Sequence, residues 1–190
     1  MTRIKGQAIR GVLKSVKESG WSIPELIQAL PEAEREVYAR PIVVSTWYPY
    51  SAFAALIRAA DRVHGSGNLQ LCFDLGRRGG QRDMGTTFRI ITAISSVDFV
   101  LKQSVLFWGK YCDKGRMILE REAPMSCVGR MEDFPDIDNG HCEMIAGWLE
   151  GVGSGLGAIG LRCRQVLCVH RGDPHCGYDC RWAGVRGPLS

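Results

Sequence analysis

The sequence predicts an α+β fold in which N-terminal helices pack on a four-stranded antiparallel sheet. Apolar residues recur at helical spacing up to about residue 113, and from about residue 114 they alternate partly, as in half-buried strands. The C-terminal elements follow the order strand–strand–helix–strand–strand, which favours an antiparallel sheet with helices on one side. There is no internal repeat and no clear linker, so we expect one domain over residues 1–190, helical over about 1–113 and sheet-containing over about 114–184.

Three helices are predicted at the N-terminus. The first spans residues 4–18, where apolar side chains repeat at helical spacing, and Gly20 ends it. Ser22 is a suitable N-cap for the second helix, and Glu25 three residues later completes a capping box. Pro31 begins a short third helix, because proline is tolerated in the first helical turn.

An extended, aromatic-rich connector follows over residues 42–50. The helical pattern then resumes in four segments: residues 51–63, 69–75, 86–94 and 96–111. Between the second and third of these, residues 76–85 are rich in glycine and charge, which predicts a break in the helix.

The sheet is predicted from four strands with one helix between them. The strands are expected at residues 115–122, 125–131, 163–168 and 176–182. The helix is expected over 141–149, and the glycine run 151–157 should weaken or end it. A phosphate-binding loop needs a strand before it and a helix after it, and this run has the reverse order, so we do not assign one.

Composition and charge exclude several classes of function. The net charge is +4, from 24 basic and 20 acidic residues that form no dense basic patch, so nucleic-acid binding is not predicted. The N-terminus lacks a secretory signal, and no stretch is long and apolar enough to span a membrane. We therefore expect a cytoplasmic protein whose eight cysteines are reduced thiols.

The cysteines are the sharpest chemical signal. A turn at residues 171–174 places Cys168 opposite Cys176 in a hairpin, and Cys142, in the first turn of the preceding helix, can approach the end of the sheet. Cys180 should share the face of Cys176, whereas Cys163 should point the other way.

Two functional interpretations of these thiols compete with a structural one. Zinc prefers four thiolate or imidazole ligands, so Cys142, Cys168 and Cys176 can supply three, and a histidine can supply the fourth: His141, His170 or His175. A cysteine nucleophile with a histidine base is a second interpretation, although no local signature supports it. The structural alternative is that the thiols are small buried hydrophobic side chains.

Aromatic residues are the candidate binding residues for a small molecule. An apolar ligand pocket can be lined by Trp47, Tyr48, Phe53, Phe107 and Trp108. Ordinary packing in the core and between helices is the alternative for the same side chains.

Several motifs resemble those of the 4-vinyl reductase-type domain. They are Gly-Trp-Leu-Glu-Gly at 147–151 and Cys-Val-His-Arg-Gly-Asp-Pro-His-Cys-Gly-Tyr at 168–178. Lys-Gly at 5–6, Ser-Thr-Trp-Tyr-Pro at 45–49 and Arg-Trp at 181–182 extend the resemblance over nearly the whole chain, to a myxobacterial paralogous family related to that domain. The fold of that domain is shared with aromatic-sensing transcription activators and with TRAPP subunits.

The resemblance implies an apolar pocket between helices and sheet, and pairing of two copies through their N-terminal helices. It also implies a zinc site formed by a helix cysteine, a strand glutamate and two hairpin cysteines. The matching positions in this chain are Cys142, Gln165, Cys168 and Cys176, so a neutral amide replaces the carboxylate. Any zinc bound here would be structural.

The predicted function is a non-enzymatic module that binds or senses an apolar or aromatic small molecule. We expect it to be a homodimer that acts through a separate partner protein. The alternative is a TRAPP-like scaffold for protein–protein assembly, with the pocket filled by its own side chains. No nucleotide or flavin motif is present, and no residues suited to a reduction are found.

Overall fold

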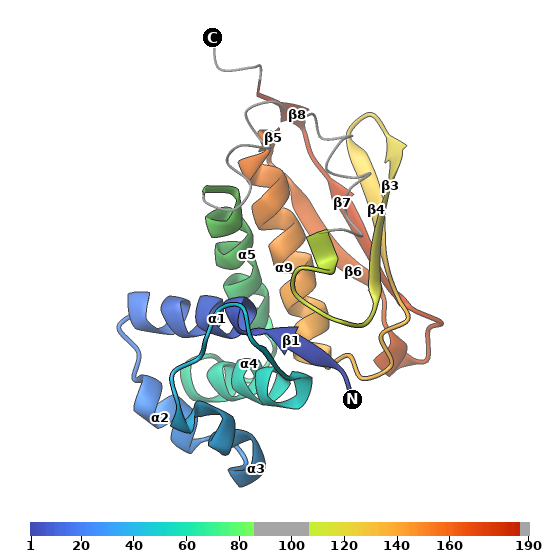
Figure 1. Cartoon of the computed structure of the whole chain (residues 1–190). Coiled ribbons are helices and arrows are strands. Elements are labelled where there is room, and N and C mark those ends of the chain that lie inside the picture. Colours follow the sequence, from blue (N-terminus) through green and yellow to red (C-terminus); the bar gives the residue numbers. More distant parts are fainter. Residues whose placement is uncertain (86–106, 187–190) are drawn as a thin grey trace.

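A four-stranded antiparallel sheet forms one layer of the protein, as Figure 1 shows for the computed structural model. The structure describes residues 1–85 and 107–186. The strands lie in the order β3 (Arg116–Ala123), β4 (Ser126–Glu132), β7 (Cys176–Arg181) and β6 (Arg162–Leu167). The predicted α+β class and antiparallel sheet are therefore confirmed.

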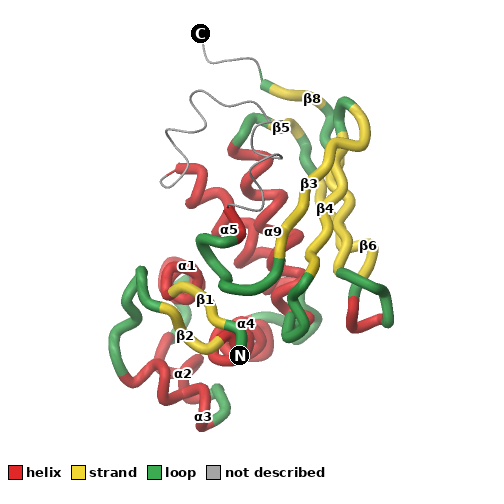
Figure 2. Tube along the Cα trace, turned by 45° about the vertical axis from the view of Figure 1, so that its right-hand side comes forward, coloured by secondary structure: helices red, strands yellow, loops and turns green. Residues whose placement is uncertain are grey.

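Helix α9 (Asn139–Gly155) lies against one face of this sheet, and α5 (Gln70–Gly85) packs along α9 (Figure 2). The helical elements of the N-terminal part gather at one end: α1 (Gly6–Glu18), α2 (Ile23–Gln28), α3 (Glu32–Arg35), the 3-10 turn η1 (Glu36–Ala39) and α4 (Tyr50–His64). A second 3-10 turn, η2 (Val169–Arg171), lies between β6 and β7. Helix α9 contacts both α5 and the strands β6 and β7, so it is buried on two sides and its sequence is apolar around most of its circumference.

The N-terminal segment starts as a strand rather than as a helix. The prediction of a helix from residue 4 is wrong at its first turn, because β1 (Arg3–Lys5) pairs with β2 (Trp47–Pro49) in the aromatic connector. The predicted cap at Ser22 is present: its side chain accepts a hydrogen bond from the Glu25 N–H at 3.2 Å. A second small sheet joins β5 (Ala158–Ile159) to β8 (Gly184–Val185), which the sequence did not suggest.

The glycine-rich stretch 76–85 lies inside α5, so the break predicted there is wrong. Helix α9 passes through Gly151 and Gly153 and ends at Gly155, within the run that was predicted to weaken or end it. In α5, a Cβ at Gly76 would overlap the Met144 carbonyl oxygen of α9. In α9, a Cβ at Gly147 would overlap the Phe73 carbonyl oxygen of α5. Glycine lets the two backbones touch, and this close packing of the helices offsets the lower helix propensity of glycine.

The helices predicted over residues 86–94 and 96–111 fall mostly outside the described residues. Phe107 and Trp108 are helical, and the chain then turns at residues 109–111. Within the described parts of the chain, no helix is long and apolar enough to cross a membrane.

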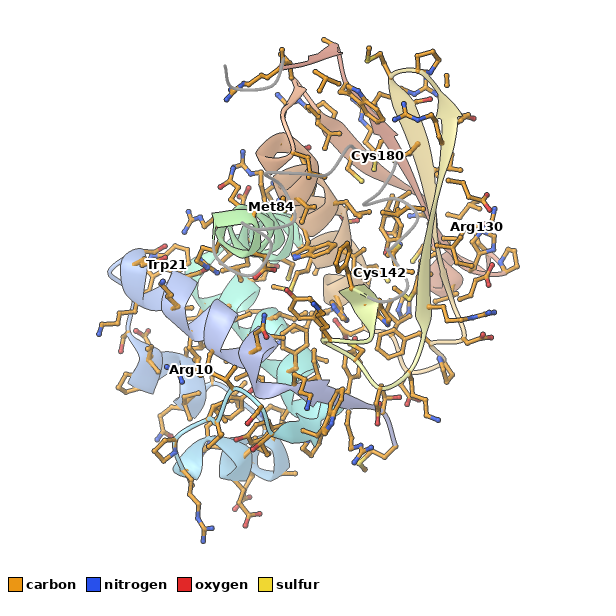
Figure 3. The ribbon with its side chains drawn as sticks, turned by 45° about the horizontal axis from the view of Figure 1, so that its top comes forward. Arg10, Trp21, Met84, Arg130, Cys142 and Cys180 are labelled. Atoms are coloured by element: carbon orange, nitrogen blue, oxygen red, sulfur yellow. The ribbon has the colours of Figure 1, made fainter. Side chains whose placement is uncertain are left out.

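A bulge in β6 changes which way its cysteines face. The register between β6 and β7 slips between Gln165 and Leu167, so Cys163 pairs with Cys180, and their sulfurs are 2.8 Å apart. The prediction that Cys163 points to the opposite face is therefore wrong. Figure 3 shows Cys180 on the side of the sheet that faces the helices, whereas Arg130 of β4 projects away from them.

Candidate functional site

A cavity of about 160 Å³ lies between the helices and the sheet. It is bounded by α1, α4, α5 and α9 and by the inner face of strands β3, β4 and β7. Its described walls are mainly apolar and include Val12, Leu75, Met117, Leu119, Met144, Ile145 and Leu149. A cavity of this kind, mainly apolar with a few polar groups, is the usual form of a small-molecule site.

Three of the five predicted aromatic residues line this cavity, namely Phe53, Phe107 and Trp108. The structure does not bring Trp47 or Tyr48 to it. Trp47 lies in β2 with the Lys5 ammonium 4.2 Å from its ring centroid, and the Tyr48 hydroxyl accepts a hydrogen bond from the Val43 N–H at 2.8 Å. Both residues therefore support the N-terminal ribbon rather than the cavity wall.

A polar group at one side of the cavity was missed by the sequence reasoning. Asp83 lines the cavity, and one of its carboxylate oxygens accepts hydrogen bonds from the Tyr111 hydroxyl at 2.6 Å and from the Trp148 indole N–H at 2.8 Å. Burial, followed by the charge and hydrogen bond of Asp83, raises the pKa of Tyr111, which stays protonated. Asp83 lies in the glycine- and charge-rich stretch that was predicted to be irregular, so no periodic signal marked it.

His141 is the polar residue of the cavity wall that stands among aromatic rings. It lies in the first turn of α9 and is 6% exposed. Its ring stacks on Trp108, with 5.8 Å between centroids, and meets Phe53 edge-on at 5.1 Å. Burial lowers the pKa of His141 to about 3, so the imidazole is neutral.

The hydrogen bonds of Tyr50 favour one tautomer of His141. The Tyr50 oxygen accepts the Asp138 backbone N–H at 2.9 Å and lies 3.0 Å from His141 Nδ1. We assign the Tyr50 proton to this contact, because Nδ1 is the one acceptor found for it among the described residues and the oxygen already accepts from Asp138. His141 is then the Nε2–H tautomer, and no residue in the described parts of the chain hydrogen-bonds Nε2.

Two thiols of the sheet also line the cavity. The hydrogen bond that Cys127 donates to Cys180, together with burial, raises the pKa of Cys127. Accepting the bond from Cys127 lowers the pKa of Cys180. The bond that Cys180 donates to Cys163, together with burial, outweighs this effect, so the pKa of Cys180 is raised. Both groups are therefore neutral thiols at neutral pH rather than thiolates.

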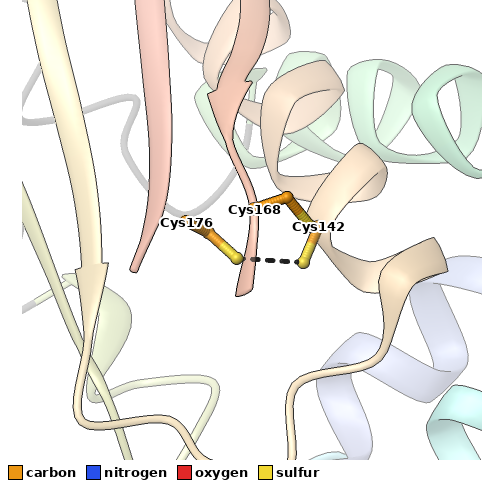
Figure 4. A group of neighbouring side chains, drawn as sticks. All are labelled: Cys142, Cys168 and Cys176. Atoms are coloured by element: carbon orange, nitrogen blue, oxygen red, sulfur yellow. Dashed lines mark hydrogen bonds between the residues drawn. The ribbon is translucent and has the colours of Figure 1, made fainter. Parts of the chain in front are cut away.

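A second site lies at the end of the sheet, where the structure brings Cys142, Cys168 and Cys176 together (Figure 4). All three residues are buried, and their sulfurs lie within 4.8 Å of one another. The Cys142 and Cys176 sulfurs are 3.3 Å apart. Helix α9 supplies the first cysteine and the β6–β7 hairpin supplies the other two, so the cluster could hold a metal ion.

One of these thiols is already activated as a ligand. The hydrogen bond from Cys142, against the opposing effect of burial, lowers the pKa of Cys176 to about 6, and the Val169 N–H also contributes. The same hydrogen bond raises the pKa of Cys142. The pair therefore shares one proton, with the thiolate on Cys176, which is the form that binds metals.

Gln165 lies beside this cluster. Its side-chain amide lies close enough to Cys142 to act on the pKa of that thiol, yet neither its nitrogen nor its oxygen makes a hydrogen bond of ordinary geometry. In residues 1–85 and 107–186, no histidine or carboxylate joins the three sulfurs within 4.8 Å. Of the predicted alternatives, His170 contacts the Ile137 carbonyl oxygen at 2.8 Å and His141 faces Tyr50.

No protein-family profile and no curated protein matches the sequence of this chain. Its fold is similar to that of an H-NOX protein from S. oneidensis in the Fe(II) ligation state, with a TM-score of 0.72, 16% identity, and coverage of 98% of this chain and 100% of the other. A structure described as probing the function of heme distortion in the H-NOX family matches with a TM-score of 0.62 and 10% identity, covering 98% of each chain.

A trafficking protein particle complex subunit 3 from Naegleria fowleri, bound covalently to palmitic acid, matches with a TM-score of 0.46 and 11% identity over 63% of this chain and 82% of the other. At these identities the comparisons establish the fold, which is that of H-NOX domains. The predicted resemblance to the 4-vinyl reductase-type domain has no family match behind it.

Proposed function

We propose that this protein is a non-enzymatic module that binds a small apolar or aromatic molecule in the cavity and transmits its occupancy to a separate partner. The observation that carries this proposal is the cavity itself, with Phe53, Phe107 and Trp108 in its wall. The fold of the H-NOX proteins, some of which were solved in ligated iron states, supports a sensing role. A cytoplasmic homodimer is part of the proposal, and light scattering of the purified protein tests the dimer.

The scaffold alternative requires a pocket that the protein fills with its own side chains. A cavity of about 160 Å³ favours ligand binding over this alternative, because natural cores are packed to a density that leaves few voids larger than a water molecule.

A cavity-filling variant tests the proposal. Native mass spectrometry before and after organic extraction would reveal a co-purifying molecule, and Gly79→Leu should abolish it. Gly79 lines the cavity, and a Cβ there meets Trp148 at an ordinary 3.8 Å, so the added side chain can enter without a backbone clash. Gly85→Leu in the same helix is the matched control, because a Cβ at Gly85 has no neighbour within 4 Å and the residue does not line the cavity. Equal ligand content in both variants would contradict the proposal.

The H-NOX comparison raises the question of whether the cavity of this chain suits heme. Iron needs an electron pair from an axial ligand such as a neutral imidazole nitrogen, a thiolate or a phenolate. His141 presents an N–H group, Cys127 and Cys180 are thiols, and Tyr111 donates its proton to Asp83. Residues 86–106 contain no histidine, cysteine, methionine or tyrosine. The wall has methionine thioethers at Met117 and Met144, which heme proteins pair with a histidine. These residues do not fit an axially ligated heme.

Titration with hemin checks this conclusion. We expect the absorption spectrum to remain that of free or loosely bound hemin, with no one-to-one complex after gel filtration. A stoichiometric complex with a sharp Soret band that is lost in His141→Phe would show that His141 can release its Nε2 proton to iron.

We also propose that Cys142, Cys168 and Cys176 hold one structural zinc ion. The convergence of three buried sulfurs and the lowered pKa of Cys176 support it. Elemental analysis of protein produced with zinc should give about one ion per chain, and Cys168→Ser should lose the ion together with stability. Cys72→Ser, which alters a buried cysteine outside the cluster, is the control. Zinc-free wild-type protein would refute the assignment.

A further inference from the structure

His141 is a buried polar group whose second nitrogen has no partner in the described structure. Its Nε2 carries the proton because Tyr50 donates to Nδ1, and the residue lines the cavity. A buried donor that is left unpaired destabilises the protein, so a group of this kind in a cavity wall marks a position where a ligand can pair with it.

Water is a poor partner at this position. A buried water is retained when two to four polar groups bind it. The rings packed around His141 are those of Tyr50, Phe53, Trp108 and Phe134, and the Tyr50 hydroxyl is already occupied by His141 and Asp138. Among the described residues, a water at Nε2 would therefore have a single strong partner.

We infer that the Nε2–H group of His141 anchors an uncharged aromatic ligand through a carbonyl oxygen of that ligand. The aromatic wall accepts the rings, and the N–H group supplies the one directional contact among them. An anionic group is disfavoured at His141, because a charge there would lose its hydration beside Phe53 and Trp108 with a neutral donor as its partner. The guanidinium of Arg82, which also lines the cavity, donates to the Gly11 carbonyl oxygen and pairs with Glu18. This inference rests on the proposed function, since it names the ligand class of the same cavity.

The assigned tautomer also bears on the comparison with the H-NOX proteins, which were solved with iron. An imidazole that donates from Nε2 cannot give an electron pair from that atom to a metal. The Tyr50 hydroxyl and the Asp138 backbone N–H together hold His141 in the tautomer that donates from Nε2.

Two probes that differ by one carbonyl group test the inference: 1-indanone and indane. An engineered cavity of roughly 150 Å³ admits benzene, so a molecule of two fused rings is a suitable size for this site. In calorimetric titrations of the full chain, the wild type should bind 1-indanone about fivefold more tightly than indane, the difference that one net hydrogen bond typically supplies. In His141→Phe the ratio should fall to one or below, because the ketone is then buried without a donor.

Nitrogen NMR of the wild type provides the second measurement if the variant does not fold. The imidazole ¹⁵N shifts should report the Nε2–H tautomer, and 1-indanone should shift the Nε2 signal while indane leaves it unchanged. Binding of both probes with the same ratio in wild type and His141→Phe, or an Nε2 signal that responds equally to both, would overturn the inference and leave the proposed function standing. Binding of neither probe would overturn both.

Discussion

At the scale of single residues, Gln165 lies beside the cysteine cluster for which we propose a zinc ion. Its amide atoms are buried and make no hydrogen bond of ordinary geometry, which costs stability unless an ion or another group pairs with them. An amide is a weak zinc ligand compared with a carboxylate, and it adds no negative charge to offset the cation.

We expect Gln165→Glu to bind zinc about tenfold or more tightly than the wild type, in line with the roughly 10–100-fold that supporting partners of a metal site contribute. The metal-free variant should be less stable than the metal-free wild type, because a new carboxylate would lie near the Cys176 thiolate. Chelator competition and urea unfolding measure the two effects. Gln165→Leu is the control, and an affinity increase there as large as with glutamate would contradict the prediction.

Cys72 provides a test of pH dependence at a thiol that belongs neither to the cavity lining nor to the cysteine cluster. Burial raises the pKa of its thiol from 9.0 to about 12, and the thiol donates a hydrogen bond to the Ile57 carbonyl oxygen at 3.5 Å. Because the folded pKa is above the unfolded one, the stabilisation is complete below about pH 9 and is lost as pH rises toward about 12.

From about pH 9 to about 10.5, the free energy of unfolding of the wild type should fall by about 1.5 kcal/mol more than that of Cys72→Ala. Urea titrations across this range measure the difference, with the value of each protein at neutral pH as its own reference. Parallel curves for the two proteins would show that the thiol ionises equally in both states.

Single residues also show what could be foreseen from the sequence. The convergence of Cys142, Cys168 and Cys176 was foreseeable, because a turn signal defines the hairpin and a cap precedes the helix. The pairing of Tyr50 with His141 joins residues 91 positions apart, and no local pattern encodes such a contact. The donor role of His141 therefore needed the structure.

At the scale of elements, the contact between α5 and α9 depends on glycines that face each other's backbone. Gly76 and Gly80 of α5 meet the carbonyl groups of Met144 and Trp148, and Gly147 and Gly151 of α9 meet those of Phe73 and Arg77. Sequence rules treat such glycines as helix breakers, since propensity is a local quantity and close helix packing is not. The strands were easier to predict, because alternation and turn residues are local signals.

Gly76→Ala should destabilise the protein by about 2 kcal/mol or more, because the methyl group overlaps backbone that cannot rotate away. Gly79→Ala, one turn on in the same helix, should instead stabilise it by about 0.5–1 kcal/mol through better helix propensity. Thermal and urea unfolding of both variants provide the comparison. Effects of the same sign at the two positions would argue against close backbone packing.

At the scale of the whole molecule, the helical part and the sheet share α9. This helix packs on α5 on one side and on β6 and β7 on the other, and the carboxylate of its buried Glu150 accepts the Cys163 N–H at 3.2 Å. A separation into a helical unit and a sheet unit would expose both of its faces, so we propose that the chain folds as one domain.

Unfolding in urea should therefore be a single transition, with coincident midpoints by far-ultraviolet circular dichroism and by tryptophan fluorescence. Trp148 on α9 and Trp182 beyond β7 report on the two layers. Variants that keep either Trp148 or Trp182 as the single tryptophan, with the other four of the five replaced by phenylalanine, isolate each signal. Midpoints that differ beyond error would indicate two separately folding parts.

The bulge in β6 has a consequence for how this sequence can vary in length. Cys176 and Cys180 are four positions apart, so they lie on the same face of β7. Their partners Cys168 and Cys163 are five positions apart, and in a regular strand this odd spacing would place them on opposite faces. The extra residue at the register slip restores the parity. Val166, whose side chain is largely exposed, can accordingly be exchanged for many residues, but removing it would force either the thiols beside the cavity or the metal cluster to turn outward. At this position the number of residues in the strand matters more than which residue is present.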